Sequence, residues 1–86
     1  MLKLPSRLDL ERALVAASVA HHDYEQNRLG GVRDDQWPGW YAAYVLGRLG
    51  DFASPSELAA WLEGVETEHG WPAAAAARVG EALGVS

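Results

Sequence analysis

Apolar side chains recur at helical spacing through the first third of the chain. Between Ser6 and Arg28 a set of residues shares one face at about 100° per residue. The other side carries Asp9, Arg12, Asp23, Gln26 and Asn27. Ser6 is suited to cap the start of this helix, with Asp9 in the first turn, and Gly30-Gly31 is suited to end it. The predicted inner face carries Leu10, Ala13, Leu14, Ala17, Ala20, His21 and Tyr24.

A second helix is predicted over residues 37–49, with Asp34 or Asp35 as its cap and Pro38 in its first turn. Its only charged residue is Arg48. Aromatic side chains occupy one side of it, and alanines and leucines occupy the other. A helix that is apolar all round has to be covered all round. We therefore expect this aromatic helix to be central in the fold.

The second half of the chain predicts two more helices. Ser54-Pro55-Ser56-Glu57 has the form of a capping box with proline at the first helical position, and this helix should end at His69-Gly70. Trp71-Pro72 opens the last helix, which should span Ala73 to about Leu83. The expected core faces carry Leu58, Trp61, Leu62 and Val65 in the former and Ala75, Ala76, Val79, Ala82 and Leu83 in the latter.

The composition supports an all-α fold. The 86 residues include fifteen alanines, no isoleucine and a single threonine, so strong helix formers greatly outnumber β-branched residues. A chain of this length can bury one modest core. We predict a compact four-helix bundle in which residues 1–86 form a single helical domain and the helix at about 37–49 is central.

Charge and cysteine usage exclude several functional classes. A net charge of −5 with scattered cations argues against nucleic-acid binding, and the absence of cysteine excludes a disulfide scaffold or a thiolate zinc site. No apolar run is long enough to span a membrane, and the first residues are too interrupted for a secretory signal. We therefore expect a cytoplasmic protein that binds neither nucleic acid nor membrane and uses no cofactor.

His21 is the main candidate for chemistry, because it lies on the apolar face of the first helix with Glu25 one turn further on. A buried imidazole needs partners for its ring nitrogens. Glu25 can hold one nitrogen and fix the tautomer, which leaves the other facing the aromatic helix. His21 then either ties two helices together structurally or acts as a general base oriented by Glu25. In the second case Tyr24, Tyr41 or Tyr44 would stabilise developing negative charge.

The other two histidines predict less. His22 is expected to face solvent, and His69 is expected to end the third helix, where a cation favours the helix dipole. Glu66 and His69 have the i, i+3 spacing of carboxylate-bridged di-iron bundles, and only His22 and Glu25 offer a second pair. A metal-binding bundle would bring these four residues together; we predict no metal site.

The aromatic residues most simply build the core, yet aromatic walls beside a charged cluster also describe a small-molecule site. Their tyrosine hydroxyls need partners, for which His21, Glu25 and Arg48 are candidates. We predict a binding or interaction module with a groove between the first two helices. The groove would receive a small apolar ligand or a protein partner, including a second copy in a homodimer. Its predicted residues are His21, Tyr24, Glu25, Trp37, Trp40, Tyr41, Tyr44 and Arg48.

Two stretches resemble a small helical domain of actinobacterial proteins. They read Ala20-His21-His22-Asp23-Tyr24-Glu25 with Leu29-Gly30, and Asp34 followed by Trp37-Pro38-Gly39-Trp40-Tyr41-Ala42-Ala43-Tyr44. The family pattern is A-H-x-x-H/Y-E, L-G and D-x-x-W-P-x-W-Y-A-x-Y, found alone or attached to glyoxalase-like (vicinal oxygen chelate) domains. The resemblance covers about residues 13–50 and implies a glyoxalase-like partner protein. It also implies one unit made of His21, Glu25, Trp37, Trp40, Tyr41 and Tyr44.

Overall fold

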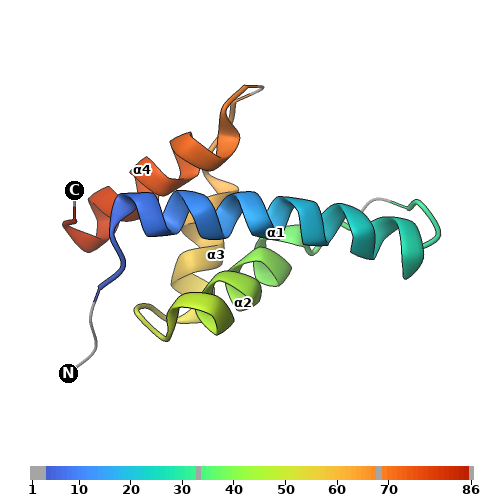
Figure 1. Cartoon of the computed structure of the whole chain (residues 1–86), viewed down its shortest axis with the longest axis horizontal. Helices are drawn as coiled ribbons and strands as arrows, with labels where there is room; N and C mark the ends of the chain where they lie inside the picture. Colours follow the sequence, from blue (N-terminus) through green and yellow to red (C-terminus); the bar gives the residue numbers. More distant parts are fainter. Residues whose placement is uncertain (1–3, 33, 68, 86) are drawn as a thin grey trace.

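The computed structural model describes residues 4–32, 34–67 and 69–85, and this part of the chain contains four helices. They are α1 (Arg7–Asn27), α2 (Trp37–Leu49), α3 (Pro55–Glu63) and α4 (Trp71–Leu83). α1 packs against α2 and α4, and α3 packs against the same two helices, so the four form a closed ring (Figure 1). The predicted all-α four-helix fold is confirmed.

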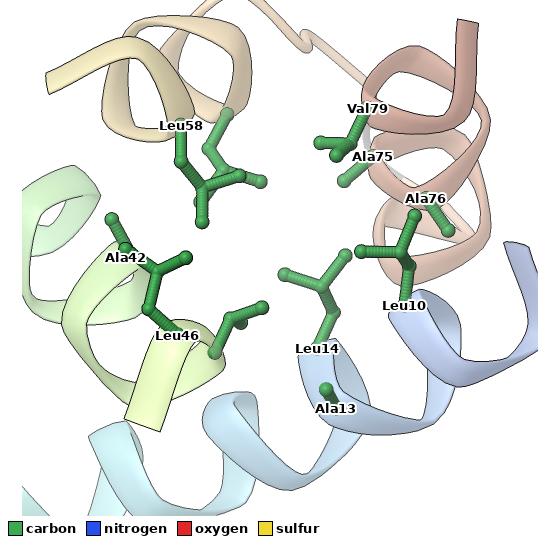
Figure 2. Packing of buried hydrophobic residues seen from close by; sticks show 11 residues of the cluster. Leu10, Ala13, Leu14, Ala42, Leu46, Leu58, Ala75, Ala76 and Val79 are labelled. Atoms are coloured by element: carbon green, nitrogen blue, oxygen red, sulfur yellow. The ribbon is translucent and has the colours of Figure 1, made fainter. Parts of the chain in front are cut away.

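The core fills the middle of this ring. Leu14 of α1, Leu46 of α2 and Leu58 of α3 point toward a common centre, and α4 adds smaller side chains from the fourth side (Figure 2). A fully buried leucine contributes about 1.5–3 kcal/mol relative to an exposed one, so this cluster supplies much of the driving force for folding. The buried hydrophobic residues are Leu10, Ala13, Leu14, Ala17, Ala42, Val45, Leu46, Leu58, Leu62, Ala75, Ala76 and Val79.

α1 begins and ends where the sequence predicts. The Ser6 hydroxyl accepts the Asp9 N–H at 3.1 Å, and the Asp9 carboxylate accepts the Ser6 N–H at 3.2 Å, which completes a capping box. After α1 the chain passes through Gly30 and Gly31 at φ of 62° and 84°, a left-handed conformation that glycine adopts without steric penalty. This reversal brings α2 back alongside α1 (Figure 1).

α2 occupies one place in the ring rather than its centre. The prediction that it is covered on all sides is wrong, because its outer face carries Gly39, Ala43, Gly47 and Arg48, all exposed. Three of these residues have little or no side chain, so their exposure leaves little apolar area in water. The predicted cap is also wrong: the N-cap is Gln36, without a side-chain hydrogen bond.

α3 begins as predicted and ends earlier. The Ser54 hydroxyl accepts the Glu57 N–H at 3.2 Å and donates to the Glu57 carboxylate at 2.9 Å. The helix stops at Glu63 rather than at residues 69–70, because Gly64 and Val65 close it with a tight turn in which the Val65 N–H bonds the Leu62 carbonyl at 3.2 Å. His69 therefore does not end a helix, and the predicted helical pairing of residues 66 and 69 is wrong.

α4 begins two residues earlier than predicted, at Trp71. Ala75, Ala76 and Val79 are buried as expected, whereas Ala82 is exposed and Gly80 is buried in its place. Within the described residues, none of the helices combines the length and the apolar character needed to cross a membrane.

Candidate functional site

An open pocket of about 460 Å³ lies where the second half of α1, the loop after it and the first turns of α2 and α4 meet. Pockets that hold small molecules have volumes of about 300–1,000 Å³, so this one is large enough for a ligand. Three aromatic and three ionisable side chains surround it. The lining residues are His21, Glu25, Gly31, Asp34, Trp37, Tyr41 and Trp71.

The imidazole of His21 is bound by a loop carboxylate. Its Nε2 lies 3.0 Å from Oδ2 of Asp34, and its Nδ1 lies 3.8 Å from Oε1 of Glu25. The second separation is too long for a hydrogen bond. The prediction that Glu25 holds a ring nitrogen by hydrogen bonding is therefore wrong. Asp34 makes that bond, and the side chain of His21 is only 8% exposed.

Glu25 positions the loop instead. Its Oε2 accepts the backbone N–H of Asp34 at 2.8 Å, and Oδ1 of Asp34 accepts the N–H of Gln36 at 2.9 Å. The chain from Asp34 to the start of α2 is thereby tied to the side of α1. The carboxylate of Asp34 is thus placed against His21 before any ligand enters.

Three rings form the aromatic wall. Trp37, Tyr41 and Trp71 contact one another edge to face, with centroid separations of 5.5–5.7 Å and interplanar angles of 78–84°. Such pairs contribute about 0.5–1.5 kcal/mol each beyond their buried area. The indole N–H of Trp71 also donates to the Val65 carbonyl at 3.1 Å, which fixes the ring that α4 contributes.

A second group of rings supports His21 from the α1–α2 contact. Trp40 and Tyr41 meet the imidazole edge-on with centroids 4.9 Å and 5.1 Å away, and Tyr24 lies at 6.1 Å. Tyr44 stacks on Trp40 at 5.6 Å and 14°. The imidazole therefore faces the aromatic helix as predicted, although only part of this group reaches the pocket.

Two groups in the pocket have shifted pKa values. The hydrogen bond from His21 lowers the pKa of Asp34, the Gln36 N–H and the charge of His21 act in the same direction, and burial opposes them. Burial raises the pKa of Tyr41, the Glu25 carboxylate adds to this, and a hydrogen bond with Ser18 opposes it. Asp34 is thus a carboxylate and Tyr41 a neutral hydroxyl at pH 7.

The structure brings together half of the predicted site. His21, Glu25, Trp37 and Tyr41 line the pocket. Tyr24, Trp40 and Tyr44 pack beside the imidazole or behind it. Arg48 lies exposed in the last turn of α2 and is not part of the lining.

Sequence reasoning missed Gly31, Asp34 and Trp71 as pocket residues. The position of Asp34 near the pocket could have been predicted from the sequence. A chain that reverses at Gly30-Gly31 brings the residues before α2 back toward the end of α1. Trp71 carried no local signal, because its place in the wall depends on how α4 packs.

The remaining histidines lie elsewhere. His22 and His69 are exposed, as expected for His22, and His69 lies outside α3. Among the described residues, no three or more histidine, aspartate or glutamate side chains are grouped so that they could hold a metal ion. His22, Glu25, Glu66 and His69 therefore do not converge.

No known protein family, curated protein or solved structure matches this chain. The resemblance to the actinobacterial helical domain stays a prediction, as does the association with glyoxalase-like proteins. Function is inferred from the pocket itself.

Proposed function

We propose that this chain is a small-molecule binding module whose ligand lies in the pocket between α1, α2 and α4. The observation that carries the proposal is the pocket of about 460 Å³ with an aromatic wall and a separate cluster of ionisable groups. Ligand sites combine apolar walls with a few polar groups that fix orientation. Trp37, Tyr41 and Trp71 supply the wall, and His21, Glu25 and Asp34 supply the polar groups.

The internal contacts of the pocket support binding. The rings are packed against one another, and Asp34 is fixed by His21, Glu25 and Gln36. A site that is already ordered loses little side-chain entropy when a ligand enters. Binding therefore does not require a rearrangement of the helices.

A protein partner is a weaker match to this site. A second copy would gain little by covering the outer face of α2, because that face exposes mainly small residues. The large exposed apolar side chains lie elsewhere, among them Leu8, Val15 and Val19 on α1. Nothing in the pocket geometry favours either a second copy or a glyoxalase-like protein, so both stay predictions.

Catalysis by His21 is a second candidate, and its specific support is the short contact with Asp34. A carboxylate bonded to an imidazole orients the ring and stabilises its charged form. Asp34, rather than Glu25, would then be the orienting residue. A binding module leaves its ligand unchanged. Proton NMR of a bound compound over several hours therefore separates the two functions, and turnover that is lost in His21→Gln would favour catalysis.

The binding proposal is tested with small aromatic compounds, including 2-phenylethanol, 2-phenylethylamine and phenylacetate. In amide-detected NMR, at least one of them should shift the indole N–H signals of Trp37 and Trp71 and leave that of Trp61 unchanged. Trp61 is half-buried in the core and does not line the pocket. Trp71→Phe should weaken binding several-fold, whereas Trp61→Phe should not. Absence of any shift at Trp37 and Trp71 across the series would reject the proposal.

A further inference from the structure

We infer that the pocket takes an organic cation, an ammonium group carried on an apolar body. This inference rests on the proposed binding function and names the class of ligand. It follows from the juxtaposition of two carboxylates with an aromatic wall in one open pocket, where Glu25 and Asp34 lie with Trp37, Tyr41 and Trp71.

The ionisable side chains of the pocket carry a net negative charge. Two carboxylates beside one imidazole sum to −2 when His21 is neutral and to −1 when it is protonated. No lysine or arginine lines the pocket within the described part of the chain. The net charge of −5 gives the surrounding field the same sign, and such a field attracts cations. The pocket thus favours positive charge in either state of the imidazole.

One carboxylate oxygen in the pocket is available to accept a hydrogen bond from a cation. Asp34 already binds His21 and Gln36, and Oε2 of Glu25 is taken by the Asp34 N–H. Oε1 of Glu25 lies 3.8 Å from Nδ1 of His21, which is beyond hydrogen-bond distance, and the hydrogen bond that Glu25 makes within the described residues uses Oε2. With 23% of its side chain exposed, Glu25 is also more accessible than His21. Oε1 of Glu25 is therefore the acceptor available to an ammonium group.

The aromatic wall of the pocket also attracts a cation. The face of an aromatic ring attracts a cation within about 6 Å of its centroid, and tryptophan does so most strongly. Trp37 and Trp71 both line the pocket beside Tyr41. The rings can hold the apolar body of a ligand and also add to the attraction of its charged end. A carboxylate ligand would instead meet two like charges.

A metal ion suits this pocket less well than an organic cation. A divalent ion needs about six oxygen ligands, or four with nitrogen, and it gains nothing from indole rings. Among the described residues, no three histidine, aspartate or glutamate side chains are placed so that they could hold a metal ion together. One carboxylate oxygen and a ring face are sufficient for an ammonium group.

The test compares three compounds of nearly the same shape: 2-phenylethylamine (cation), 2-phenylethanol (neutral) and phenylacetate (anion). Each is titrated at pH 7 while the indole N–H signals of Trp37 and Trp71 are followed by NMR. The amine should bind about tenfold more tightly than the alcohol, the size expected for a charge-assisted hydrogen bond, and phenylacetate should bind most weakly. The preference for the amine should fall at about 0.5 M salt, because salt screens charge.

Glu25→Gln is the matched variant, because its amide oxygen can still accept the Asp34 N–H. It should bring the affinity for the amine close to that for the alcohol, so that the ratio of the two affinities falls toward one. Glu63→Gln, an exposed change at the end of α3, should preserve the preference.

The outcomes separate the inference from the proposed function. Equal binding of amine and alcohol by the wild type, or tightest binding of phenylacetate, overturns the cationic ligand and leaves the binding function standing. Binding of none of the three overturns both. If Glu25→Gln does not fold, the ratio of amine to alcohol affinity in the wild type and its salt dependence decide the question alone.

Discussion

Asp34 joins three parts of the chain through one residue. Its side chain binds His21 of α1 and the N–H of Gln36, and its own N–H is accepted by Glu25. The hydrogen bond from the imidazole is the main cause of its lowered pKa. A loop of few residues is thereby held against a helix side by polar contacts.

His21→Leu should raise the pKa of Asp34 toward its ordinary value of 3.8, because leucine removes both the hydrogen bond and any charge. Titration of side-chain carboxyl carbons by ¹³C NMR measures this directly. An unchanged pKa at Asp34 would contradict the assigned role of the imidazole.

The same shift makes a stability prediction with a definite sign. A carboxyl whose pKa is lower in the folded state adds stability above its unfolded pKa, and that stability is lost as the pH falls through the folded value. In wild type, Asp34 should therefore contribute fully above pH 3.8 and progressively less below it. Asp34→Asn should flatten this acid limb of the unfolding free energy, as measured by urea titrations at several pH values.

At this scale the sequence predicts the orientation of His21 and not its partner. Helical periodicity shows which residues share a face, so the contact with the aromatic helix follows from spacing. The identity of the bonded carboxylate depends on the path of the loop after Gly31. Glu25 lies one turn along the same helix and was therefore the expected partner of His21. It accepts the backbone N–H of Asp34 instead.

Among the helices, two glycines of the α2 region have opposite roles. Gly47 lies within α2 and is exposed, whereas Gly50 follows the helix at a φ of 98°. A Cβ atom added at either position meets nothing within 4 Å, so the two sites differ in backbone conformation and not in space.

Gly47→Ala should stabilise the protein by about 0.5–1 kcal/mol, because alanine loses less backbone entropy in a helix. Gly50→Ala should destabilise it by about 1 kcal/mol or more, because a positive φ strains any residue with a Cβ atom. Urea unfolding of both variants under the same conditions tests the pair. Changes of the same sign would contradict this assignment.

The ends of the elements show the limit of periodicity. The starts of α1 and α3 were predictable because Ser6 and Ser54 carry local capping signals. The end of α3 was not, because Val65 continues the apolar spacing of the helix although it lies past its end. The turn after α3 places Val65 against the core, and the indole N–H of Trp71 donates to the Val65 carbonyl. Sequence spacing alone cannot distinguish this arrangement from a longer helix.

For the molecule as a whole, the aromatic wall connects α2 and α4 at their N-terminal ends. α1 and α3 separate these two helices around the ring (Figure 1). Trp71 of α4 nevertheless contacts both Trp37 and Tyr41 of α2. Removing this contact should weaken the closure of the bundle as well as the pocket.

A double-mutant cycle of Trp37→Leu and Trp71→Leu should show a coupling energy of about 0.5–1.5 kcal/mol in urea unfolding. The control cycle pairs Trp37→Leu with Trp61→Leu, which has no described ring contact with Trp37, and its effects should add to within about 0.5 kcal/mol. Equal coupling in both cycles would mean that the wall has no specific pairing energy.

Placing one ring of the wall near residue 70 and its two neighbours near residue 40 has an evolutionary consequence. A change of ring size at Trp71 alters its packing against Trp37 and Tyr41, and substitutions at those two positions would compensate for it. Substitutions at these three positions should therefore be correlated among homologous sequences. Because the wall draws residues from both halves of the chain, recombining the halves of two homologues would not transfer the ligand specificity of the pocket.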